Sequence, residues 1–401
     1  MKKVLLGIAL LLLLVAGLPA HAQSNGVALG KIIYLKSNGE NEPYGETLGD
    51  LYSYTPGDAA AVRETTWGYN DIPILSPNGQ YVVYLSLPQF MVELLATDDP
   101  NALMAGGIKN IWLWNLATGD FTRIADQPAD ATAFNGIYRS RPAWSPDSTK
   151  LAWVEMRVTE SAVRSQLMIY NLADGTTQLV VDSISVGFQD AAFVVPNTLA
   201  WGESLIWQYF TFGLGEDGSR GGTVIEVINE TGLLNRFEIQ YLDDPGPPFI
   251  RAQWMQREGQ WVIGMLFEAN TWQILNPATG ERAFLKNPPV LQTPTGQGYK
   301  LGYDDGSGWY GVAESSFALG TIETTVSAAL SPDGNSIAIV HDDGYGVLMT
   351  PEGLGFIPDD TGTETAGLLH VVWSPMIWHA EGDASPVDSL PLNSDAPTPA
   401  G

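Results

Sequence analysis

Residues 329–340 read AALSPDGNSIAI, and residues 141–154 read RPAWSPDSTKLAWV. A third version, IPILSPNGQYVVYL, occupies 72–85, and a shorter fragment, VVWSP, occupies 371–375. In the full copies an apolar stretch precedes the turn, and a second stretch with alternating side chains follows it. Proline sets φ for a tight turn, and Asp or Asn followed by Gly or Ser tolerates the next geometry. Each full copy therefore predicts a β-hairpin.

A second repeated phrase follows these hairpins. IWLWNLATGDFTRI (111–124), LMIYNLADGTTQLV (167–180) and WQILNPATGERAFL (272–285) are near-copies of one another. Weaker versions occupy 51–64 and 225–239, and a last one occupies 347–357. Each version predicts a strand, a turn that closes on glycine, and another strand. The turn glycines are Gly57, Gly119, Gly175, Gly232, Gly280 and Gly353.

The two phrases occur equally often once degenerate copies are included. Turns of the first phrase are expected at 77–79, 146–148, 196–197, 258–259, 332–334 and 374–375. The first glycine phrase has no hairpin before it, and the last hairpin has no glycine phrase after it. Each chain end therefore supplies the strands that the other lacks.

A four-stranded repeat of about 40–50 residues is typical of β-propellers. We expect an all-β, six-bladed propeller over residues 27–380. Strands from both chain ends, KIIYLK (31–36) and HVVWS (370–374), are expected in one blade, which closes the ring and leaves no exposed sheet edge there. Seven blades are the alternative if 297–325 forms a degenerate repeat.

The combined phrases resemble the WD40-like repeat of TolB-type β-propellers. The resemblance covers most of residues 30–378 and is strongest in 72–124, 141–181 and 327–357. TolB carries an α/β domain ahead of its propeller, and we expect only the propeller part here. The resemblance implies the fold and leaves the activity open, because one fold serves many functions.

Both ends of the chain differ in composition from the repeats. Residues 1–22 combine Lys2 and Lys3, an apolar run and Ala20-His21-Ala22, which predicts a cleaved signal peptide. The apolar run is shorter than the ~20 residues of a spanning helix, so we expect no stable membrane insertion after cleavage. Residues 381–401 are rich in Pro, Ser and Asp, which predicts a disordered tail. The expected location is secreted or periplasmic.

The charge of the chain limits its partners. It has 19 basic and 45 acidic residues, a formal charge of −26, and no cysteine. This negative field excludes nucleic acid and anionic lipid surfaces as natural partners. An exported chain without disulfides depends on its core for stability. We expect a soluble acidic monomer.

The connections predict where ligands bind. In antiparallel blades, the turns of both phrases lie at one end, here named the short-turn face. The remaining connections, which include long insertions, lie at the other end, named the long-connection face. The insertions are 37–49, 86–108, 125–140, 156–165, 204–222, 241–249 and 286–326. Loops held by a rigid scaffold often carry binding residues.

Aromatic side chains gather in these insertions and suit contact with sugars or protein partners. Packing at the blade ends is the alternative role for them. The expected ligand-binding residues are Trp207, Tyr209, Phe212, Trp309, Tyr310 and Tyr138.

Catalytic and metal-binding patterns are not found in the sequence. After the signal, the histidines are His341, His370 and His379, without the short spacing of a metal site. No G-x-S-x-G elbow is present, and the acidic turns do not match a calcium loop. We expect no cofactor, no metal and no catalytic residue, and hence a non-catalytic module that binds a protein or an envelope glycan. The alternative is a carboxylate-dependent glycosidase or polysaccharide lyase, whose paired acids leave no sequence spacing.

Overall fold

The computed structural model describes most of the region predicted to fold. The described residues are 30–37, 48–97, 107–158, 162–186, 199–244, 246–269, 271–294, 299–303, 309–313, 325–364, 366–380 and 382–387. The predicted signal peptide, the predicted turn at 196–197 and most of the predicted tail lie outside them. Within them, α2 (Gln89–Leu95) is a short helix, and no helix has the length and apolar character needed to cross a bilayer.

The described strands pair into six sheets, numbered I to VI in this article. Sheet I has the order β28 (Leu368–Val372), β1 (Ile32–Lys36), β2 (Asp50–Tyr54), β3 (Val62–Arg63). Sheet II has the order β4 (Ile74–Leu75), β5 (Tyr81–Ser86), β6 (Asn110–Asn115), β7 (Phe121–Ala125). Sheet III contains β8 (Tyr138–Arg139) and β9 (Ala143–Trp144), which both pair with β10 (Lys150–Val158), then β11 (Ala162–Asn171) and β12 (Thr176–Val186).

Sheet IV has the order β13 (Leu199–Trp201), β14 (Leu205–Leu214), β15 (Arg220–Asn229), β16 (Gly232–Tyr241). Sheet VI has the order β24 (Thr325–Leu330), β25 (Ile337–His341), β26 (Gly346–Thr350), β27 (Gly353–Phe356). Sheet V has nine strands: β17 (Phe249–Arg257), β18 (Gln260–Phe267), β19 (Thr271–Leu275), β20 (Arg282–Leu285), β21 (Val290–Gln292), β22 (Tyr299–Tyr303), β23 (Trp309–Ala313), β29 (Ile377–His379) and β30 (Ala384–Pro386). In sheet V, β29 pairs parallel to β17 and antiparallel to β21, so it joins two smaller strand groups.

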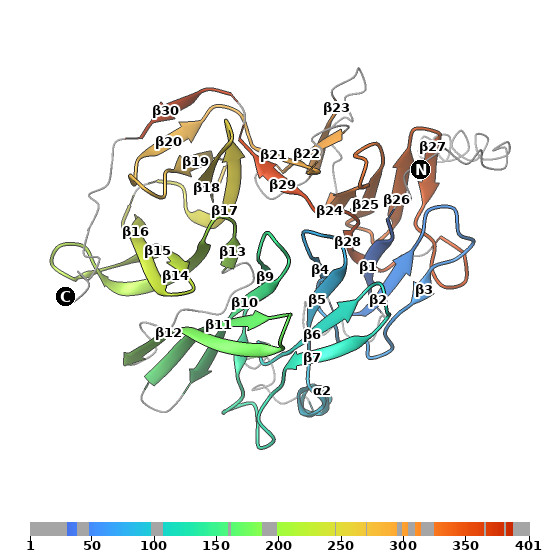
Figure 1. The fold of residues 1–401 in the computed structure, drawn as a ribbon, viewed down its shortest axis with the longest axis horizontal. Helices are drawn as coiled ribbons and strands as arrows, with labels where there is room; N and C mark the ends of the chain where they lie inside the picture. Colours follow the sequence, from blue (N-terminus) through green and yellow to red (C-terminus); the bar gives the residue numbers. More distant parts are fainter. Residues whose placement is uncertain are drawn as a thin grey trace, which may run out of the picture.

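The sheets stand around a common centre, with β28, β4, β9, β13, β17 and β24 on their inner sides (Figure 1). The first described strand, β1, meets β28, which lies late in the chain, in sheet I, where Tyr34 of β1 lies opposite Val371 of β28. This all-β arrangement of radial antiparallel sheets is the architecture of a β-propeller.

Hydrophobic clusters connect each sheet with the next in sequence order, and sheet VI with sheet I. Strand β1 shows how the sequence achieves this. Ile32 and Tyr34 pack toward sheet VI, whereas Ile33 and Leu35 pack toward sheet II. Successive side chains of a strand point to opposite faces, so a strand buried on both faces needs a continuous apolar run. The run IIYL satisfies this need.

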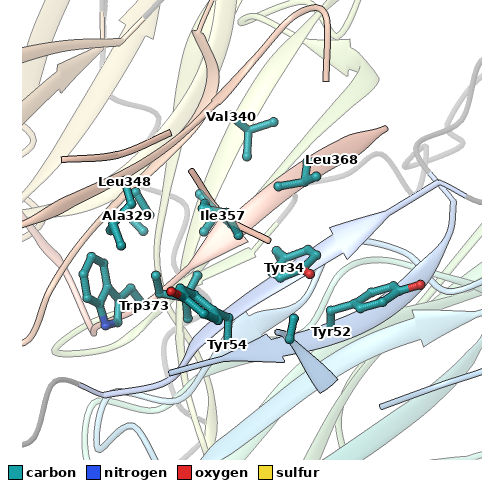
Figure 2. Close-up of a cluster of buried hydrophobic side chains, with 13 residues drawn as sticks. Tyr34, Tyr52, Tyr54, Ala329, Val340, Leu348, Ile357, Leu368 and Trp373 are labelled. Carbon is teal, nitrogen blue, oxygen red and sulfur yellow. The ribbon is translucent and has the colours of Figure 1, made fainter. Parts of the chain in front are cut away.

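The cluster between sheets I and VI is rich in aromatic rings (Figure 2). The rings of Tyr34 and Tyr52 are stacked with centroids 5.2 Å apart. Buried polar atoms of the cluster find partners in the backbone: the Tyr34 hydroxyl donates to the Pro358 carbonyl at 2.6 Å, and Trp373 Nε1 donates to the Gly30 carbonyl at 2.7 Å. These bonds fasten the first described strand to segments from the last part of the chain.

The repeated Ser-Pro-Asp turn is stabilised by its own side chains. In the copy at 331–334, the buried Ser331 hydroxyl donates to Asp333 at 2.5 Å and accepts the backbone N–H of Ser336 at 2.9 Å. The turn ends on Gly334, whose φ of 72° is in the region that favours glycine. The short-turn face is therefore closed by local hydrogen bonds.

Two parts of the chain differ from the expectation. The insertion predicted at 204–222 is largely the β14–β15 hairpin, because its alternating side chains suit a strand whose two faces are both covered. Residues 384–386, predicted to be part of a disordered tail, form β30 and pair with Phe284 and its neighbours on β20. An edge strand presents unpaired backbone groups, and this segment satisfies them.

Candidate functional site

The structure places Trp207 in the core and Tyr209 half-buried against the same cluster. Trp207 on β14 is 2% exposed and packs in the cluster between sheets III and IV. Tyr209 lies beside it, with ring centroids 5.0 Å apart, and donates to Glu226 at 2.6 Å. Residues two apart on a strand share one face, and this face of β14 is turned toward sheet III. The prediction of Trp207 as a surface anchor is therefore wrong, because a buried ring is not accessible to a ligand.

The other predicted residues lie at the long-connection face or outside the described side chains. Phe212 is 44% exposed and packs edge-on against Phe210 at 5.2 Å. Tyr138 on β8 is half-buried between small apolar clusters. Trp309 and Tyr310 lie on β23, and their side chains lie outside the described part. The predicted aromatic residues do not come together in one described site.

Exposed large apolar side chains of the described residues fall into two groups. One group lies on the outer strands β3, β12, β16, β20 and β27: Val62, Leu179, Leu233, Leu234, Phe284, Leu354 and Phe356. The other lies at the long-connection face: Trp67, Phe134, Phe212, Leu242, Ile250, Val326 and Tyr345. Phe134 is the most exposed of them, at 74%. None of these residues lies in the turns of the short-turn face.

A buried ionic network lies at the inner side of the same face. Asp71, in the connection to β4, accepts from Lys109 Nζ at 3.0 Å and from an Arg141 terminal nitrogen at 2.9 Å. Burial alone would raise the pKa of Asp71, but the charges of Lys109 and Arg141 outweigh this and hold it below its usual value. The three side chains bind the inner ends of sheets II and III together.

Beside this network, His370 of β28 is half-buried, and its Nδ1 lies 3.0 Å from the Ser327 hydroxyl of β24. Burial and, to a smaller extent, the Arg141 charge lower the pKa of His370 to about 4, against the opposing charge of Asp71. The Ser327 hydroxyl also accepts the Val371 backbone N–H at 3.2 Å. These contacts fix the inner strands of sheets I and VI and do not expose a nucleophile.

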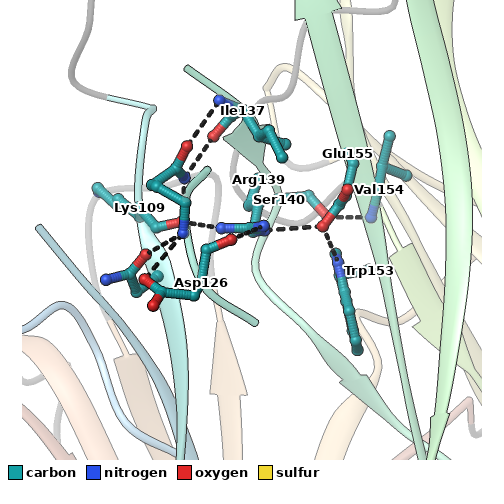
Figure 3. A network of polar contacts seen from close by, with 10 residues as sticks. Lys109, Asp126, Ile137, Arg139, Ser140, Trp153, Val154 and Glu155 are labelled. Carbon is teal, nitrogen blue, oxygen red and sulfur yellow. Dashed lines mark hydrogen bonds and ion pairs between the residues drawn. The ribbon is translucent and has the colours of Figure 1, made fainter. Parts of the chain in front are cut away.

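A second ionic pair continues the network outward between sheets II and III (Figure 3). Arg139 and Glu155 lie directly opposite each other on β8 and β10, and Arg139 Nε donates to Glu155 at 2.9 Å. The two other guanidinium nitrogens each donate at 2.8 Å to the carbonyls of Lys109 and Asp126. Trp153 Nε1 donates to the same Glu155 oxygen at 3.2 Å. Burial lowers the pKa of Arg139, and the Glu155 charge opposes this effect.

Gln127, in the connection between β7 and β8, adds further hydrogen bonds to this network. Its amide nitrogen donates to the carbonyls of Lys109 at 3.0 Å and Ile137 at 2.9 Å. Its amide oxygen accepts the Ile137 backbone N–H at 2.8 Å. The connection is therefore held against sheet III by fixed hydrogen bonds.

A cleft of about 370 Å³ opens over this network. Its lining residues are Ile124, Ala125, Asp126, Gln127, Pro128, Ile137, Arg139, Trp153, Glu155, Arg157 and Thr177. The deep residues are the paired Arg139 and Glu155, whereas Arg157 is exposed at the rim. We take this cleft as the candidate ligand site, because it combines a rigid polar floor with accessible apolar and cationic groups.

The chemistry of the buried acids in the described residues is restricted. Four carboxylates are buried, and each has a cationic partner: Asp50 with Arg63, Asp71 with Lys109 and Arg141, Glu155 with Arg139, and Asp359 with Lys36. In this part of the chain, no group of three or more His, Asp or Glu residues is placed to hold a metal ion. Ion-paired carboxylates stabilise the structure and are poorly suited to carry a proton.

Sequence reasoning missed these network residues. A signal existed: Glu155 interrupts the apolar strand KLAWVEMRV, and Arg139 and Arg141 precede a strand in a chain with few basic residues. A charged residue inside an apolar strand predicts a buried partner.

No protein family profile matches this chain, and a comparison with curated protein sequences finds no match. Among solved structures, an oligogalacturonate lyase in complex with manganese is 14% identical over 83% of this chain and 92% of its own length, with a TM-score of 0.48. The β-propeller domain of Cps50 (Swd1) from Myceliophteria thermophila is 12% identical over 77% of this chain and 91% of its own, with a TM-score of 0.43. A Pyrococcus horikoshii acylaminoacyl peptidase is 13% identical over 73% of this chain and 46% of its own, with a TM-score of 0.41. These likenesses are too distant to indicate an activity or a subfamily.

Proposed function

We propose that this chain is an exported, non-catalytic β-propeller module that binds a protein or an envelope glycan through its long-connection face. The observation that carries the proposal is the placement of exposed apolar side chains. Among the described residues, and apart from those on the outer strands, they gather at the long-connection face, and none of them lies in a described turn of the short-turn face. Exposed apolar groups on a rigid scaffold mark interaction surfaces.

The proposal includes a closed ring. The unbroken series of clusters from sheet I to sheet VI and back to sheet I supports closure. The ring in this proposal has seven blades, whereas the repeats predicted six. The seventh blade consists of β29, β21, β22 and β23, which pair with the neighbouring blade within sheet V. A closed ring positions the connections of different blades around one axis, where a partner can contact several of them together.

The alternative function is a carboxylate-dependent glycosidase or lyase. Such an enzyme needs one carboxyl group that holds a proton and another that accepts one. The four buried carboxylates of the described residues are ion-paired, and the cations of Lys109 and Arg141 lower the pKa of Asp71 despite its burial. This pairing favours binding over catalysis.

The test uses residues 23–401 as immobilised protein with a cell-envelope extract. Phe134→Ser and Leu242→Ser together remove exposed apolar area from the long-connection face. Val62→Ser and Leu354→Ser together remove similar area from outer strands and serve as the matched control. We expect partners retained by the wild type to be lost with the first pair and kept with the control pair, as measured by quantitative mass spectrometry.

Equal retention by both double variants would contradict the proposed face. A parallel incubation of soluble protein with polysaccharides tests the alternative: turnover that disappears on replacement of a single Asp or Glu would show an enzyme.

A further inference from the structure

Arg157, at the rim of the cleft between sheets II and III, lies opposite a residue of the same charge on the neighbouring strand. On β10 it is directly opposite Arg164 of β11. Like charges directly opposite each other on neighbouring strands are destabilising. Arg164 is neutralised by two contacts with Asp182, one of them from Nε at 2.7 Å. Arg157 makes no ion pair with another described residue.

The remaining charges of the cleft do not compensate Arg157. Arg139 is already engaged by Glu155 and by two backbone carbonyls. Asp126 is paired with Arg123 at 2.9 Å. The cleft and its rim therefore carry three arginines and two carboxylates, an excess of one positive charge in a chain whose formal charge is −26. A guanidinium with free donors at a rigid cleft is suited to a carboxylate, which it can bind through two parallel hydrogen bonds.

The walls of the cleft favour one kind of carboxylate ligand. Recognition of a sugar ring commonly uses an accessible aromatic face, and the aromatic residue of this lining, Trp153, is 1% exposed. The accessible walls are instead aliphatic and small: Ile124, Ala125, Pro128 and Thr177. Such walls fit the methylene groups of an acidic amino-acid side chain.

We propose that this cleft binds an acidic peptide segment, with a Glu or Asp carboxylate of the ligand paired with Arg157. The inference rests on the proposed binding function and specifies its ligand class. The Arg139–Glu155 pair forms the fixed floor and does not contact the ligand carboxylate. The aliphatic walls contact the rest of the acidic side chain.

The experiment measures fluorescence polarisation of a labelled Glu-rich decapeptide with residues 23–401. A Gln-rich decapeptide of the same length tests the need for the carboxylate, and a uronate oligosaccharide is the competitor of the other ligand class. Arg157→Gln removes the proposed contact. Arg236→Gln, a half-exposed arginine on β16 in sheet IV, is the charge-matched control. Thermal melting checks that both variants are folded.

We expect saturable binding of the Glu peptide, no binding of the Gln peptide, and a loss of about tenfold or more for Arg157→Gln with little change for Arg236→Gln, since bonds to charged groups are the stronger hydrogen bonds. Equal binding by Arg157→Gln, equal binding of the Gln peptide, or tighter binding of the uronate would each overturn the inference. If the peptide assay fails but the envelope-extract experiment still shows capture through the long-connection face, only the acidic-peptide inference is wrong. If both experiments fail, the proposed binding function is wrong as well.

Discussion

His370 gives the structure a pH dependence that can be measured. Burial, with the Arg141 charge in the same direction, lowers its pKa from 6.5 to about 4. The unfolded chain binds a proton near pH 6.5, whereas the folded chain does so only near pH 4. Because the unfolded state binds more protons between these values, the free energy of unfolding decreases as the pH falls through this window.

The size of the effect follows from the two pKa values of His370. The gap between 6.5 and about 4 corresponds to about 3 kcal/mol when the pH is below both. Between pH 7 and pH 5 the expected loss is about 2 kcal/mol, because the folded imidazole is still neutral at pH 5 while the unfolded one is almost fully protonated.

The assay is urea unfolding at pH 7 and pH 5 with wild type, His370→Asn and His341→Gln. Asn keeps a polar atom near the Ser327 hydroxyl and cannot titrate in this range. We expect the difference between the two pH values to shrink by about 2 kcal/mol in His370→Asn and to stay at the wild-type size in His341→Gln. An unchanged difference in His370→Asn would refute the assignment of a neutral imidazole in the folded chain.

Two further predictions concern stability. Asp71→Asn removes the buried carboxylate that pairs with Lys109 and Arg141 and should lower the free energy of unfolding by about 3–5 kcal/mol in urea titrations. Asp58→Asn on an exposed turn should change it by under about 0.5 kcal/mol. A loss below about 1 kcal/mol for Asp71→Asn would show that the cations find other partners. Deletion of residues 382–401 removes β30 and should lower the melting temperature and increase light scattering on heating, because the edge of β20 becomes unpaired. An unchanged melting curve would mean that β30 contributes nothing to stability.

Local sequence determined the hairpins and their turns. The six turn glycines predicted from the second phrase all have positive φ, between 70° and 143°. Ser331 and Asp333 of the first phrase bond within their own turn. Such interactions need only residues that are close in sequence, so the repeated letters were sufficient to predict them.

The sequence predicted the packing between sheets only in part. The run IIYL predicted a strand, and a strand with two apolar faces requires neighbouring sheets on both sides. The sequence could not show that β29 inserts between β17 and β21. It also misplaced Trp207, whose hydrophobic neighbours on β14 were read as an aromatic loop. A strand with alternating aromatic side chains and a loop with scattered ones have similar compositions.

The ionic network was decided by the tertiary structure. Arg139 and Glu155 are 16 residues apart and meet through strand register within one sheet. Asp71 and Arg141 are 70 residues apart and belong to different sheets. Their contact exists only because packing brings the inner ends of sheets II and III together around a common centre. The sequence by itself determined which segments fold as hairpins, because turn formation is local. The arrangement of the sheets decided which buried charges neutralise each other. The same arrangement left Arg157 without a described partner at the rim of the cleft.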